Sequence, residues 1–129
     1  MMPTMNAKPP ERGPLADLLS HYRRKVARQS VRELAARLRR SPQDVNDFGI
    51  GRRVPDLDYL LLFSAEFGLD YEALCDMLPA QRKATEAYHQ HVHLVYADPG
   101  FRPRWMQGDR FISDEEAAIL LAVQEDEHA

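Results

Sequence analysis

The sequence predicts an all-α protein in which a domain of five helices is followed by a helical C-terminal extension. Three observations indicate this. Apolar residues recur three and four positions apart along most of the chain, as on the buried face of a helix. Helix-capping residues precede most of these stripes, and glycine or proline follows them. The sequence shows neither the period-two alternation nor the hairpin turns that predict strands.

The chain of 129 residues is expected to divide into three parts. Residues 1–13 contain several prolines and predict a flexible N-terminal arm, residues 14–78 hold the five helices, and residues 79–129 form the C-terminal region. No apolar run reaches the roughly 18 residues of a membrane span. A single cysteine, Cys75, excludes an intrachain disulfide and is typical of a reducing, cytoplasmic compartment.

The first two helices are predicted from their starts. Pro14 suits the first position of a helix, and Leu15 begins the apolar stripe that follows. Ser30 and Glu33 have the spacing of a capping box, in which each side chain bonds the backbone N–H of the other residue. The second helix is then expected to bury Leu34, Ala35 and Leu38.

The third helix has the strongest start signal in the chain. Ser41 is a good N-cap, and Pro42 a good first helical residue. Val45 and Phe48 lie three positions apart and are the expected buried pair. The residues expected to point outward are Gln43, Asp44, Asn46 and Asp47.

The next two helices follow at once. The segment 49–51, with a glycine at each end, is expected to end the third helix. Asp56 caps a fourth helix whose high apolar content predicts a central position, and Gly68 ends it. Asp70 caps a fifth helix, and Pro79 is expected to stop it.

The C-terminal region is predicted to be helical over residues 80–96 and again after Ser113, with a break at Asp98-Pro99-Gly100. Ser113 and Glu116 repeat the capping-box spacing. The last helix is strongly apolar for a terminal one, so it must pack on the body or on a second copy. Homodimerisation is the preferred role of this region.

Other candidate sites are weak. His89 and His93 would share a helix face and could hold a metal, but no nearby ligand completes a site, so a packing or solvated role is favoured. Trp105 is expected to pack in a core. The sequence has no glycine-rich phosphate loop and no nucleophile with a matched base. We therefore expect no catalytic residue, metal or cofactor.

Charge is segregated along the chain. The formal net charge is −3, yet the segment from Arg23 to Arg53 holds ten basic residues against three acids, Glu33, Asp44 and Asp47. Such a surplus is what a polyanion-binding surface needs, although a solvated helix face has the same composition.

A set of residues in fixed order then points to one family. In sequence they are Glu33-Leu34-Ala35, Leu38, Ser41, Val45, Phe48, Gly51-Arg52-Arg53, Pro55, Leu57, Leu60, Phe67-Gly68-Leu69-Asp70 and Leu74. With these, residues 30–78 resemble the Cro/XRE-type helix-turn-helix family, the lambda-repressor-like DNA-binding domains. The family usually has a glycine in the turn between its second and third helices, where this chain has Arg39.

The resemblance implies a sequence-specific, dimeric DNA-binding transcriptional regulator of the repressor type, with the third helix in the major groove of double-stranded DNA. It makes Gln43, Asp44, Asn46 and Asp47 base-reading candidates, with Pro42 at the tip. Phosphate candidates are Ser30, Ser41, Arg52 and Arg53, and Arg40 in the turn is a further DNA-contacting candidate.

Two alternatives stay open. Asp44 and Asp47 would repel phosphates, which favours an adaptor that binds a protein such as a polymerase, a toxin or another regulator. A nucleoid-type protein that binds many DNA sites would show the same basic segment.

Overall fold

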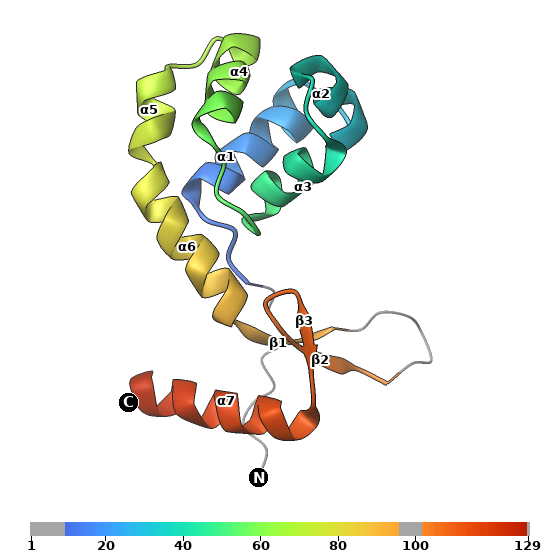
Figure 1. The fold of residues 1–129 in the computed structure, drawn as a ribbon, viewed down its shortest axis with the longest axis vertical. Coiled ribbons are helices and arrows are strands. Elements are labelled where there is room, and N and C mark those ends of the chain that lie inside the picture. The colour runs from blue at the N-terminus through green and yellow to red at the C-terminus, as the bar shows by residue number, and fades with distance from the viewer. Residues whose placement is uncertain (1–9, 96–101, 129) are drawn as a thin grey trace. The chain divides into compact units, whose positions relative to one another are not determined.

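The computed structural model describes residues 10–95 and 102–128. The chain forms two compact units, Glu11–Glu86 and Ala87–Ala129, and the change from one to the other falls within helix α6 (Figure 1). The first unit extends past residue 78, where the sequence predicts the boundary. Gln81 on α6 explains this: its buried amide accepts from the N–H of Ala16 at 2.9 Å and donates to the carbonyl of Arg12 at 2.8 Å.

The first unit is helical throughout. A π-helical turn, Tyr22–Val26, continues the first helix. The α-helices are α1 Pro14–His21, α2 Val31–Leu38, α3 Pro42–Ile50, α4 Leu57–Phe67, α5 Tyr71–Asp76 and the first part of α6 Leu78–Gln90.

The predicted caps of these helices are confirmed. The side chains of Ser30, Ser41 and Asp56 accept from backbone N–H groups in the first turns of α2, α3 and α4. The predicted stop at Pro79 is wrong: α5 ends at Asp76, and Pro79 is the second residue of α6. A proline fits there because the first-turn N–H groups of a helix have no intrahelical partner.

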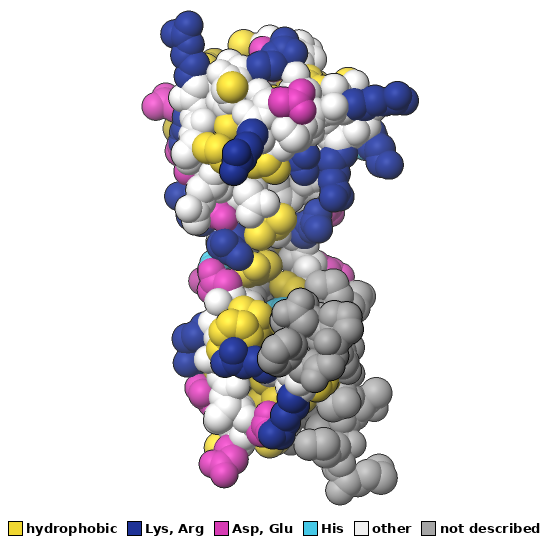
Figure 2. Space-filling model, turned by 90° about the vertical axis from the view of Figure 1, so that its right-hand side faces the viewer, with side chains coloured by type: hydrophobic (Ala, Val, Ile, Leu, Met, Phe, Trp, Pro, Cys, Tyr) yellow, Lys and Arg dark blue, Asp and Glu magenta, His cyan; other side chains and the backbone are white. Residues whose placement is uncertain are grey.

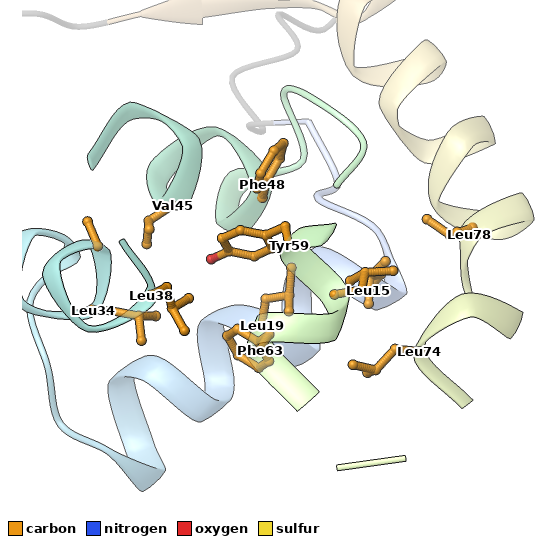
Figure 3. Packing of buried hydrophobic residues seen from close by; sticks show 12 residues of the cluster. Leu15, Leu19, Leu34, Leu38, Val45, Phe48, Tyr59, Phe63, Leu74 and Leu78 are labelled. Carbon is orange, nitrogen blue, oxygen red and sulfur yellow. The ribbon is translucent and has the colours of Figure 1, made fainter. Parts of the chain in front are cut away.

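Helix α4 lies at the centre of the core, as its composition predicts. Tyr59, Leu60 and Phe63 are at most 1% exposed. Figure 3 shows Tyr59 and Phe48 of α3 pointing toward one another, with ring centroids 4.7 Å apart. The buried cluster also draws on α1, α2, α3, α5 and α6 through Leu15, Leu19, Leu34, Leu38, Val45, Leu74 and Leu78. Several residues of the basic segment 23–53 therefore belong to helices that pack on this core.

The chain is mostly helical, as the all-α prediction expects, but the second unit adds a small sheet that was not predicted. It contains an antiparallel sheet in the order β1-β2-β3, formed by Val92–Val95, Arg104–Gln107 and Arg110–Ile112, and helix α7, Asp114–His128. The helix predicted over residues 80–96 ends at Gln90, and β1 follows. The break predicted at residues 98–100 lies outside the described residues.

The strands were missed because they are three or four residues long, too short for alternation to show in the sequence. One signal was present. Gly108, followed by Asp109, joins β2 to β3 with a φ of 60°, a conformation that glycine adopts without steric cost. A side chain at Gly108 would also collide with the backbone of His89.

Helix α7 packs on the sheet through a small core of Val92, Leu94, Trp105 and Ala117. The predicted packing of Trp105 is confirmed, since it is 6% exposed, and the N-cap at Ser113 is confirmed by its bond from the N–H of Glu116. In the described part of the chain, no helix combines the length and apolarity needed to cross a membrane.

Candidate nucleic-acid interface

Helices α2 and α3 pack on each other and are joined by a three-residue turn, Arg39 to Ser41. Arg39 ends α2 in the left-handed conformation, with φ 55° and ψ 43°. Its N–H and that of Arg40 donate to the carbonyls of Ala36 and Ala35, which satisfies the end of the helix. Arg39 therefore adopts a backbone conformation that usually selects glycine, at a cost of about 1 kcal/mol.

Asp47 does not lie where the sequence predicts. It is buried, with a side chain 4% exposed, instead of pointing outward from α3. Its carboxylate accepts from the guanidinium of Arg52 at 3.2 Å and lies 3.4 Å from Nε of Arg53. Its carbonyl also accepts from the N–H groups of both arginines. The segment after α3 thus folds back over this side of the helix, which helical periodicity alone cannot predict.

Asp44 is also engaged within the protein. Nε of Arg40 donates to its carboxylate at 3.1 Å, and Arg53 forms an ion pair with the same group. Its side chain is only 20% exposed. Asp44 and Asp47 together therefore hold the turn before α3 and the segment after it.

Arg40 ties this network to α4. Its two terminal nitrogens donate to both carboxylate oxygens of Asp56 at 3.1 and 2.6 Å, and its guanidinium lies 5.5 Å from the ring centroid of Tyr59. These hydrogen bonds raise the pKa of Arg40 and lower the pKa of Asp56 to about 2. Because Asp56 also caps α4, one arginine fixes α3 and α4 relative to each other.

The structure thus places three DNA-contacting candidates, Arg40, Arg52 and Arg53, in internal ion pairs. It brings them together with Asp44 and Asp47, and the opposite charges offset one another. Sequence reasoning missed Asp56 as a member of this network. The sequence predicted Asp56 as the N-cap of α4 but did not indicate that an arginine would bind it.

The remaining candidates are accessible. The side chains of Ser41, Pro42, Gln43 and Asn46 are exposed on the start and outer side of α3, and Ser30 is exposed at the start of α2. The oxygens of both serine hydroxyls accept backbone N–H groups, which leaves each hydroxyl proton available for donation. Four of these five side chains are polar, and none carries a charge.

Exposed cations occur in the neighbouring parts of the chain. Five basic side chains between residues 23 and 53 are exposed and form no ion pair with any described residue: Arg24, Lys25, Arg28, Arg32 and Arg39. They come from the π-helical turn, the link to α2, the start of α2 and the turn before α3. Figure 2 faces the side where α2 and α3 lie in Figure 1, and it shows dark blue side chains projecting from the first unit.

The histidines do not form the arrangement that a continuous helix would give. His89 lies on α6 and His93 on β1, so they share no helix face, and the rings of His91 and His93 stack 5.4 Å apart. Burial lowers the pKa of His93. Over residues 10–95 and 102–124, the His, Cys, Asp and Glu side chains form no group of three or more that could hold a metal ion.

Comparison with known proteins leaves the chain without an assigned relative: no family model, no curated protein and no solved structure matches it.

Proposed function

We propose that the chain is a sequence-specific DNA-binding transcriptional regulator whose first unit is a lambda-repressor-like helix-turn-helix domain. In this proposal α2 and α3 are the two helices of the motif, and α3 enters the major groove of duplex DNA. The observation that carries the proposal is the pairing of Asp44 and Asp47 with arginines, which removes the main electrostatic objection to DNA at this surface.

The exposed charges of residues 23–53 favour binding of DNA. All three acids of the basic segment are engaged: Glu33 in the cap of α2, and Asp44 and Asp47 in ion pairs. The five exposed, unpaired bases named above outnumber Glu33, the one acid of this segment without an ion pair, so a surplus of positive charge remains. Such a surplus attracts the phosphate backbone, and each phosphate that it neutralises adds affinity that salt weakens.

The structure also supports a division of labour among the candidates. Gln43 and Asn46 present amide groups that can donate to and accept from an adenine edge. Ser30 and Ser41, with Arg28, Arg32 and Arg39, are the proposed phosphate contacts. Arg40, Arg52 and Arg53 instead support the turn and the segment after α3.

A salt-titrated gel shift on random duplex DNA tests the proposal. We expect retention at low salt that disappears as salt rises, because the contacts with phosphate are ionic. Absence of retention at the lowest salt would contradict DNA binding. Selection of bound sequences from the same pool then separates a regulator, which enriches a motif, from a nucleoid-type protein, which enriches none.

Replacing Gln43 or Asn46 with alanine is expected to change the selected motif with little loss of affinity for random DNA. Each side chain is exposed and is proposed to contact bases and not phosphates, and a good paired contact discriminates by about 1–3 kcal/mol. The readout is the ratio of affinities for the selected site and for a site changed at one base pair. An unchanged ratio for both variants would remove α3 as the reading element.

A homodimer through the second unit is part of this proposal. Helix α7 packs one side on the sheet, and its other side exposes Ile119 at 66% and Val123 at 50%, one turn apart. Two copies of α7 crossing near their centres would cover these side chains and keep the acidic helix ends apart. Dimers of this DNA-binding class read two half-sites about one DNA turn apart.

Ile119→Asp with Val123→Asp is expected to convert a dimer into a monomer, as measured by light scattering, because it buries carboxylates in the apolar contact. The matched control is Leu57→Asp with Leu61→Asp on α4, which has the same spacing and similar exposure. If the unmodified chain has the mass of one copy, or if only the α4 control becomes monomeric, the proposed interface is wrong.

The adaptor alternative loses the feature that motivated it. That reading depends on Asp44 and Asp47 facing outward as acidic contacts, and both are held inside the domain by arginines.

A further inference from the structure

Helix α4 has an exposed apolar face in addition to its buried one. Leu57 and Leu61, one helical turn apart, are each 55% exposed, and Leu62 beside them is 40% exposed. Asp58 lies on the same side of the helix, three and four positions before these last two leucines. We call Leu57, Asp58, Leu61 and Leu62 the α4 leucine face. Contiguous exposed apolar side chains of this kind mark interaction sites more often than scattered single ones do.

The surroundings of this face are acidic. Residues 54–81 contain no lysine, arginine or histidine, and they contain six acids. Asp56 and Glu66 form ion pairs with Arg40 and Arg37. The other four are exposed and form no ion pair with any described residue: Asp58, Asp70, Glu72 and Asp76. The first unit therefore exposes cations in residues 24–39. It exposes leucines on α4 and acids on and around α4 and α5.

We propose that the α4 leucine face binds an amphipathic helix of a partner protein, one with apolar side chains at three- and four-residue spacing flanked by lysine or arginine. The leucines supply apolar area for such a helix, and the four unpaired acids attract its basic flanks. The same acids repel nucleic acid and anionic membranes. A second copy presenting this face would set acids against acids in a two-fold contact.

This inference does not depend on DNA binding. None of the residues proposed to contact DNA belongs to the α4 leucine face, so DNA and a protein partner could be bound at the same time. If the gel shift shows no DNA binding, the peptide experiment below still decides whether α4 is a docking site.

The test uses the full chain, labelled with ¹⁵N, and a synthetic Leu/Lys helical peptide of about 18 residues, enough for five turns. A Leu/Glu peptide of the same apolar pattern is the probe control. We expect the Leu/Lys peptide to shift amide resonances of α4 and α5, and the Leu/Glu peptide to shift none. Leu57→Gln with Leu61→Gln should weaken binding by about tenfold, which corresponds to about 1.4 kcal/mol.

The control variant is Val26→Gln, which removes an exposed apolar side chain of similar exposure from the π-helical turn and should leave the peptide affinity unchanged. A second variant, Asp58→Lys, keeps the leucines and should also weaken binding. Equal affinity for the α4 variants and the unmodified chain would overturn the proposal. Resonance shifts in every helix that carries acids, and not mainly in α4 and α5, would also overturn it. Shifts of α4 resonances that depend on protein concentration in the absence of peptide would identify a second copy as the occupant and would overturn it too.

Discussion

Removing the cations of Arg28, Arg32 and Arg39 together is expected to weaken binding to duplex DNA by about 100-fold at low salt while the fold keeps its stability. The variant is Arg28→Gly, Arg32→Ala and Arg39→Gly. All three side chains are exposed and form no ion pair with a described residue, so their charge is available to phosphate. The plot of log affinity against log salt concentration has a negative slope. The variant should make this slope less steep by about 2.7, at about 0.9 for each of the three phosphate contacts removed.

The substitutions are chosen so that lost binding cannot be attributed to unfolding. Arg28 and Arg39 have φ values of 52° and 55°, where glycine relieves about 1 kcal/mol of strain. Glycine costs about 0.5–1 kcal/mol through the freedom of the unfolded chain, so the two effects nearly cancel. At Arg32, in the first turn of α2, alanine is a better helix former and removes a cation from the positive end of the helix dipole.

The matched control is Arg82→Ala with Lys83→Ala. These two exposed cations lie on α6, which Figure 1 shows on the other side of α1 from α2 and α3. The control should change the salt slope by much less per charge removed. Equal losses in the two variants would mean that DNA responds to net charge alone, and an unchanged slope in the first variant would reject the proposed phosphate contacts.

Replacing Asp47 with alanine is expected to destabilise the first unit by about 2–3 kcal/mol. Removal of one partner from a buried ion pair costs about 3–5 kcal/mol, and the partial exposure of Arg52 and Arg53 reduces that figure. The midpoint of thermal unfolding should fall by roughly 10–20 °C for a unit of this size. Urea unfolding at neutral pH measures the change in free energy directly.

Asp58→Ala is the control for this prediction, because Asp58 is an exposed acid without an ion pair among the described residues. Its effect should stay within about 0.5 kcal/mol. The prediction also separates two roles for Asp47. A base-reading residue would change the selected DNA motif and leave stability unchanged, whereas the buried carboxylate seen here should do the reverse.

Local signals in the sequence determined most of the helical framework. Ser30, Ser41 and Asp56 start helices because their side chains satisfy backbone N–H groups within three residues, an interaction that needs no distant partner. The buried pair Val45 and Phe48 followed from helical spacing in the same way. The same helical spacing predicted that Gln43 and Asn46 point outward.

Contacts between distant residues decided the rest. Asp47 reads as an outward residue of α3, yet Arg52 and Arg53 fold back and bury it. Arg40 reads as a DNA-contacting cation, yet it bonds Asp56, sixteen positions away. The three short strands carry too little periodicity to be predicted, and they form because pairing satisfies their backbone while α7 covers one face.

By itself, the sequence determined where helices α1 to α5 begin, which side chains of α2 and α3 are buried, and that residues 23–53 carry a surplus of positive charge. Only the tertiary structure decided which of those charges remain available. A charge at the surface and a charge in an ion pair have the same local sequence signal, because the partner is brought near by folding and not by its position in the chain.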